Sequence, residues 1–167
     1  SISSEPGSPL RVTLDELGPL LFSRMLELNE SQEGLISLLY KCAQDQKISL
    51  IDLDDFRNFA SSLSRLKPQE LLQYGTISTS SLGVILRQLL QLDQQGGANL
   101  FGEPSFNIVD LLKKDAGQRG VINILRVLDI QDKPKLFSCM MLCLLTELFN
   151  TLPEVGDLEK PKLVLFI

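Results

Sequence analysis

The five residues from Leu163 to Ile167 are all apolar, and this run constrains the fold more than any other feature of the sequence. A continuous apolar run of this length predicts a strand that is covered on both faces, as in a parallel sheet. In open parallel sheets the groups that bind ligands gather just beyond the carboxyl ends of the strands. We therefore expect the chain to be a piece of a larger protein, cut short of its functional site.

A second strand and a helix are predicted before this run. Residues 121–125 (Val-Ile-Asn-Ile-Leu) are apolar and rich in β-branched side chains, which is typical of a strand. Residues 134–150 carry a pattern that predicts a helix. Strand, helix and strand in this order form a βαβ unit, in which the strands are parallel and the helix covers one face of the sheet.

The sequence before residue 117 predicts helices. Thr13 and Glu16 have the spacing of a capping box, and Asn29 with Gln32 repeats it. The predicted helices are residues 13–28, residues 29–44, a helix that begins at Asp52, residues 68–72, and a long helix that follows residues 76–81 and ends at Gly96-Gly97. An alternative start of the first helix is near Gly18, because proline at position 19 is tolerated in a first turn. The fold class is therefore mainly α with a small β component: a loop over residues 1–12, a helical subdomain over residues 13–116 and a βαβ unit over residues 117–167.

Composition excludes several classes of function. The 167 residues include no histidine, which removes Ser-His-Asp and Cys-His catalysis and the commonest zinc ligand. A net charge of -5 disfavours nucleic-acid binding by this segment. The longest apolar stretch, residues 136–149, contains Thr146 and Glu147 and is too short to span a bilayer. We expect a soluble, cytoplasmic protein with no membrane partner.

The chain has three cysteines, Cys42, Cys139 and Cys143. An odd number, with two of them inside an apolar helical run, fits a reduced interior better than a disulfide framework. No second pair of ligands accompanies Cys139 and Cys143, so the sequence does not favour a metal or redox role for them.

Two further patterns resemble a calcium-binding loop and a phosphate-binding loop. Asp52-Leu53-Asp54-Asp55 resembles the start of a calcium loop, but Phe56 occupies the fifth ligand position and the required glycine and glutamate do not follow, so a helix cap is the better interpretation. The glycines at 96–97 and 117–120 lack the lysine and hydroxyl of a phosphate loop and fit turns.

Three arginines are candidates for a role in trans on a transferred phosphate. A solvated charge or a local ion pair is the commoner role for such a side chain. The three residues are Arg24, Arg87 and Arg126.

The terminal segment carries a family resemblance. Residues 152–157 (Leu-Pro-Glu-Val-Gly-Asp) followed by residues 160–167 resemble the approach to the Walker B acids in the HerA-like bacterial ATPases, in their uncharacterised helicase-like branch. Further segments resemble that branch in the same order, from about Arg11 to the end of the chain. They are residues 18–21, 28–34, 74–75, 94–97, 101–104 and 120–125.

The resemblance implies a RecA-like P-loop core and a ring-forming ATPase related to DNA translocases. It places the phosphate loop before Ser1 and the magnesium-holding acids after Ile167, so residues 13–116 become a helical insertion between the two nucleotide motifs. No catalytic, cofactor-binding or metal-binding residue is then expected in this chain. The Walker B strand that supports the following acids is Leu163, Val164, Leu165, Phe166 and Ile167.

ATP and Mg²⁺ are accordingly expected for the parent protein and not for this fragment, which we predict neither binds ATP tightly nor hydrolyses it. A homo-oligomeric ring and DNA are partners implied for the parent alone. The alternative is a non-enzymatic helical interaction module whose terminal strands complete a partner's sheet. A phosphate-loop motif upstream and Asp-Glu directly downstream would favour the motor. Unpaired sheet edges also predict self-association of the fragment.

Overall fold

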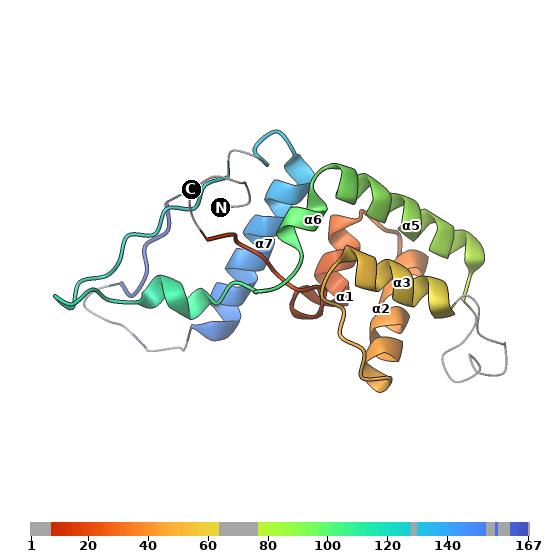
Figure 1. The fold of residues 1–167 in the computed structure, drawn as a ribbon, viewed down its shortest axis with the longest axis horizontal. Coiled ribbons are helices and arrows are strands. Elements are labelled where there is room, and N and C mark those ends of the chain that lie inside the picture. Colours follow the sequence, from red (N-terminus) through yellow and green to blue (C-terminus); the bar gives the residue numbers. More distant parts are fainter. Residues whose placement is uncertain (1–7, 64–76, 128–129, 153–155, 157–160, 167) are drawn as a thin grey trace.

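The computed structural model describes residues 8–63, 77–127, 130–152, 156 and 161–166, and within these ranges the chain is mainly helical (Figure 1). The predicted mainly α class is therefore confirmed. The helices are α1 (Leu14–Met25), α2 (Glu30–Asp45), α3 (Leu53–Leu63), α5 (Thr79–Gln94), α6 (Gly97–Leu100), the 3-10 helix η1 (Ile108–Leu112) and α7 (Pro134–Thr151). The short helix predicted over residues 68–72 lies outside the described residues.

Both predicted capping boxes are present. The Thr13 hydroxyl accepts from the backbone N–H of Glu16 at 3.2 Å, and the Glu16 carboxylate accepts from the backbone N–H of Thr13 at 2.9 Å. Asn29 and Gln32 make the same reciprocal pair at 3.0 and 3.1 Å. Each box satisfies backbone donors that a helix start leaves without an intrahelical partner, which is why these two helices begin where the sequence predicts.

Helix α1 is kinked one turn after its start. Gly18 has φ +73° and ψ 165°, a conformation open to glycine and strained for other residues, and Pro19 follows it. Proline has no N–H to donate, so the kink and the proline occur together. The helix ends at Met25 instead of the predicted Leu28, because the chain turns at Glu27, where φ is +53°.

Three aromatic rings form the centre of the helical body. The Phe22 ring of α1 meets the Phe56 ring of α3 edge-on, with centroids 5.0 Å apart, and the Tyr40 ring of α2 lies 6.2 Å from Phe22. The Tyr40 hydroxyl donates to the backbone carbonyl of Leu14 at 2.9 Å. Burial, and secondarily the nearby Asp15, raise the pKa of Tyr40, so this hydroxyl stays protonated and keeps its hydrogen bond.

Helix α7 joins this body to a second, smaller cluster. Its Leu136, Cys139 and Met140 belong to the main core. One to two turns later, Leu144 and Leu148 pack instead with Ile108 of η1. In Figure 1 the body of α1, α2, α3 and α5 lies on one side of α7, and the chain around residues 104–127 extends away on the other.

The predicted βαβ unit is wrong for this structure. Residues 121–127 and 163–166 follow an extended path (Figure 1), but neither segment is hydrogen-bonded into a ladder. The described residues contain two isolated bridges only, Val12 with Phe101 and Lys114 with Gly120. A strand needs a neighbour along its whole hydrogen-bonding edge, and in the described chain the pairing of residues 113–114 with residues 120–121 goes no further along the segment. Within the described ranges, none of the helices has the length and apolar character needed to cross a membrane.

Candidate functional site

The segment assigned as a Walker B strand is extended and exposed. Phe166 has 92% of its surface accessible, Val164 57% and Leu165 42%, whereas Leu163 packs against the cluster of Ile108, Leu144 and Leu148. The prediction that this run is covered on both faces is therefore wrong for residues 164–166 in this structure. Ile167 lies outside the described residues. What the structure supports is an apolar segment held at Leu163 only.

The second predicted strand is exposed in the same way. Ile122 and Ile124 have 89% and 84% of their surfaces accessible, and alternate residues of an extended chain point to one side. The two side chains therefore form a small exposed apolar strip. Two hydrogen bonds hold the start of this segment in place. The Val121 N–H donates to the carbonyl of Lys113 at 3.1 Å, and the Asn123 side-chain amide donates to the carbonyl of Leu111 at 3.3 Å.

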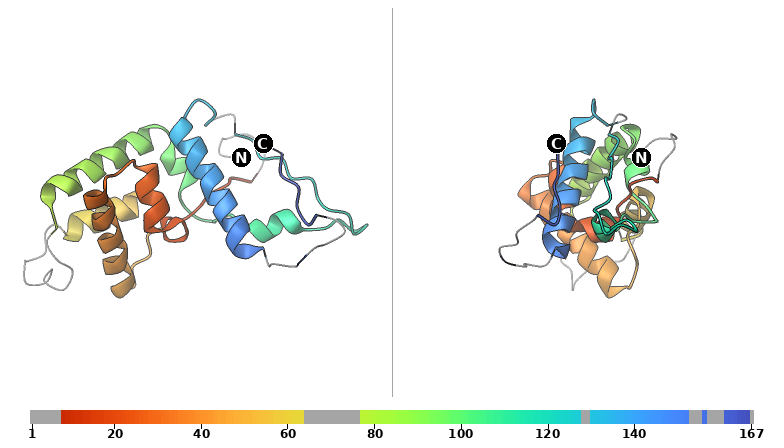
Figure 2. Two further views of the ribbon diagram at one scale, coloured as in Figure 1. Left: turned by 180° about the vertical axis from the view of Figure 1, so that it is seen from behind. Right: turned by 90° about the vertical axis from the view of Figure 1, so that its left-hand side faces the viewer.

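The two extended segments run in the same direction, and α7 runs in the opposite direction between them in sequence (Figures 1 and 2). This is the connectivity of a β-α-β crossover without the hydrogen bonds that would make its two outer members strands. Because the two segments are not paired, the described residues contain no βαβ unit.

A tight turn precedes residues 121–127 and is organised by Asp115. Its carboxylate accepts from the backbone N–H groups of Gly117 and Arg119, each at 2.9 Å, and pairs with the Arg119 guanidinium at 3.1 Å. The Arg119 backbone N–H is the main cause that holds the pKa of Asp115 below its ordinary value, and the guanidinium adds to it. The turn interpretation of residues 117–120 is thereby supported, and sequence reasoning missed the aspartate that fixes the turn.

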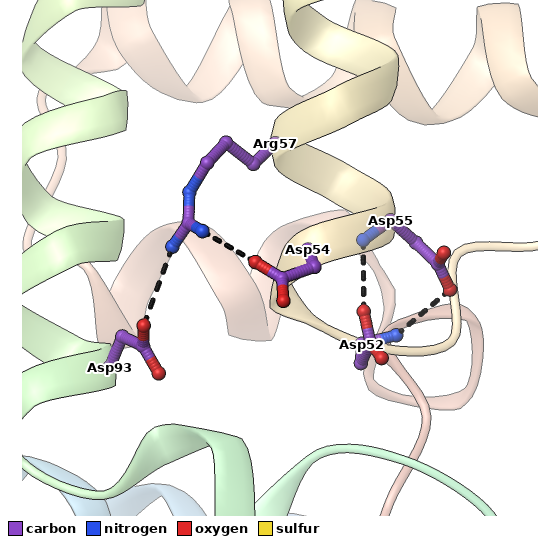
Figure 3. Close-up of polar contacts among 5 residues, drawn as sticks. All are labelled: Asp52, Asp54, Asp55, Arg57 and Asp93. Atoms are coloured by element: carbon purple, nitrogen blue, oxygen red, sulfur yellow. Dashed lines mark hydrogen bonds and ion pairs between the residues drawn. The ribbon is translucent and has the colours of Figure 1, made fainter.

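The acidic run at residues 52–55 is a helix cap (Figure 3). The Asp52 carboxylate accepts from the backbone N–H of Asp55 at 2.8 Å, and the Asp55 carboxylate accepts from the backbone N–H of Ile51 at 3.1 Å. Asp54 points away and pairs with Arg57, which also lies 3.6 Å from Asp93 of α5. These oxygens are occupied by backbone donors and a guanidinium, which agrees with the cap interpretation.

Removing this cap should destabilise the helix it starts. We expect Asp52→Ala to lower the free energy of unfolding by about 1 kcal/mol, the usual cost of losing an N-cap carboxylate. Asp54→Ala, three residues from Arg57 on the exposed face, is the matched control and should cost about 0.5 kcal/mol or less. Urea denaturation followed by circular dichroism measures both. An equal loss for the two variants would contradict the cap.

The candidate arginines lie on separate elements. Arg24 is exposed in the last turn of α1, Arg87 is exposed on α5, and Arg126 is exposed in the extended segment 121–127. In the part of the chain that the structure describes, no group of three or more histidine, cysteine, aspartate or glutamate side chains is placed to hold a metal ion. The residues that sequence reasoning singled out do not form one site.

The described residues form a helical body that one long helix, α7, joins to a smaller hydrophobic cluster and to two apolar segments that are not paired into a sheet. A model of the family described as "Helicase HerA-like C-terminal" matches residues 1–167, the whole chain. The chain belongs to this family. No curated protein and no solved structure matches it.

Proposed function

We propose that this chain is part of a HerA-like P-loop ATPase and that residues 13–116 form a helical insertion between its two nucleotide motifs. The observation that carries the proposal is the match of the whole chain to the HerA-like C-terminal family. Phosphoryl transfer requires backbone amides and a lysine around the phosphates and carboxylates around the metal. The proposal assigns these parts to the sequence that flanks this chain in the parent protein, together with ATP and Mg²⁺.

Under this proposal the two extended segments become strands of a RecA-like sheet. The exposed strip of Ile122 and Ile124 and the exposed side chains of Val164, Leu165 and Phe166 support it, because apolar surface of this extent is normally covered. The role of residues 163–167 is then mechanical: the buried strand holds the carboxylates that follow it. The parent is proposed to act in the cytoplasm as a homo-oligomeric ring, with DNA as a possible substrate of the parent and not of this segment.

The test is the magnesium-dependent hydrolysis of ATP by the full gene product and by this chain alone. We expect turnover by the full product and none by the chain. Within the full product, Ile124→Asp should lower turnover by about tenfold or more, since it places a charge in the proposed sheet. Leu90→Asp is the matched control, because Leu90 is 51% exposed on α5, away from residues 121–127, and turnover should stay within about twofold.

Two results would overturn the proposal. One is turnover by the chain alone. The other is a full gene product that lacks the phosphate loop and the acidic pair and hydrolyses no ATP, which would favour the non-enzymatic interaction module instead.

A further inference from the structure

Cys139 and Cys143 lie one helical turn apart on α7, with their sulfur atoms 3.8 Å apart. Side chains four residues apart on a helix lie on the same face, which brings the two thiols together. Cys139 is 5% exposed and belongs to the main core, whereas Cys143 is half-buried at the edge of that core. The third cysteine, Cys42, is fully buried in α2 and is an internal reference for a thiol in the core.

Cys143 also lines a cavity. The volume is about 30 Å³, and the walls are α7, residues 10–12 and the segment that includes Leu100 and Phe106. This volume exceeds the roughly 10–15 Å³ that one water molecule needs. The walls are mainly apolar, but the charged residues Arg11, Glu16 and Glu147 also line the cavity. A small polar molecule therefore has both room and polar neighbours in a cavity that Cys143 lines.

The two thiols are not equivalent. The contact with Cys143 and burial raise the pKa of Cys139, which favours its neutral thiol. The contact with Cys139 lowers the pKa of Cys143, against the opposing effects of its partial burial and of Glu147. Cys143 is also the more accessible of the two thiols, because it is half-buried and lines the cavity while Cys139 is buried, so Cys143 is placed to react first. Cys139 is placed to react second.

We propose that Cys143 and Cys139 form an oxidisable dithiol that reacts with a small hydroperoxide, of which hydrogen peroxide is the simplest. The Cys143 thiolate attacks one peroxide oxygen, the O–O bond breaks, and the departing hydroxide takes a proton to become water, which leaves Cys143 as a sulfenic acid. The Cys139 sulfur then attacks the Cys143 sulfur, the S–O bond breaks, and the departing hydroxide takes the Cys139 proton. Two thiols and one peroxide give one disulfide and two waters.

The disulfide would distort α7. Its sulfurs must approach from 3.8 Å to about 2.05 Å, and its Cβ atoms must approach from the roughly 5–6 Å of a helix to about 3.5–4.5 Å. The strained turn of α7 would lie where the helix passes from the main core, which includes Met140, to the second cluster, which includes Leu144. Because a strained disulfide is more readily reduced, a thiol reductant should reverse the reaction. The inference does not depend on the proposed ATPase function.

The test is peptide mapping of the reduced full chain after treatment with hydrogen peroxide. Trypsin separates the cysteines, because cleavage after Lys135 and Lys162 places Cys139 and Cys143 in one peptide and cleavage after Lys41 and Lys47 places Cys42 in another. We expect the first peptide to lose two hydrogens and to resist alkylation until it is reduced. Cys42 should remain a free thiol. In a brief pulse of iodoacetamide, Cys143 should react at least about tenfold faster than Cys42.

Variants separate the two roles. Cys143→Ser should abolish the internal disulfide, whereas Cys139→Ser should leave a sulfenic acid on Cys143 that dimedone captures. Cys42→Ser should behave as the unaltered chain. A trivalent arsenical, phenylarsine oxide, supplies a second measurement on the unaltered chain, since it should bridge both thiols of the first peptide. Oxidation of Cys42 as fast as of Cys143, or a sulfinic acid on Cys143 with Cys139 still free, would overturn the proposal.

Discussion

Replacing Phe56 with alanine is expected to lower the free energy of unfolding by about 3–5 kcal/mol, the range for removing a large buried aromatic side chain. Phe56 is fully buried, and its ring lies 5.0 Å from that of Phe22 and 6.0 Å from that of Tyr40. The substitution removes the ring that joins α3 to α1 and α2. The edge-on contact with Phe22 contributes more than its buried area alone, and the tilted contact with Tyr40 is lost with it.

Phe149→Ala is the matched control, because it is the same substitution at a residue with 86% of its surface exposed. Its effect on the free energy of unfolding should stay within about 0.5 kcal/mol. Urea denaturation of both variants, followed by far-ultraviolet circular dichroism, measures the difference. Equal losses at the two sites would show that the aromatic cluster does not stabilise the helical body.

Gly97→Ala is expected to destabilise the chain by about 1–3 kcal/mol, the usual cost of adding a methyl group where there is no room for it. A Cβ atom at Gly97 would lie 2.9 Å from the carbonyl oxygen of Leu92 and 3.1 Å from the side chain of Leu53. The first of these atoms is backbone at the end of α5 and cannot move without disturbing the helix. The close approach of α6 to α3 and α5 therefore requires glycine here.

The same substitution in α2 should have the opposite sign. A Cβ atom at Gly34 meets nothing within 4 Å, and this glycine is exposed in the interior of a helix. Gly34→Ala should stabilise the chain by about 0.5–1 kcal/mol, because alanine loses less backbone freedom on folding. Thermal melts of the two variants against the unaltered chain measure both effects. Destabilisation by Gly34→Ala, or none by Gly97→Ala, would contradict the packing described.

The helix starts could be predicted because they depend on local chemistry. Thr13 with Glu16, Asn29 with Gln32, and Asp52 with Asp55 each cap a helix through bonds that span three residues. The spacing of such residues in the sequence is enough to predict these bonds. The kink at Gly18 and the helix α6 were not predicted, because the first depends on a backbone conformation and the second on packing at Gly97.

The strands could not be predicted in the same way. Apolar and β-branched residues at 121–125 favour an extended chain, and the chain is extended there, but a ladder also needs a partner that the local sequence does not specify. The pair of thiols on α7 could not be fully predicted either. The spacing of Cys139 and Cys143 places them on one face of a helix, but the contact between their sulfurs and their different burial depend on the packing of α7, which the spacing does not specify.

Helix α7 is the one long element that touches both hydrophobic clusters in the described part of the chain. Its 18 residues form a rod of about 27 Å. A tilt imposed near Cys139 would be magnified at the far end, close to Leu148 and Leu163. A small change in the direction of α7 within the helical body would therefore become a larger displacement of the residues that pack against its other end, Leu163 among them.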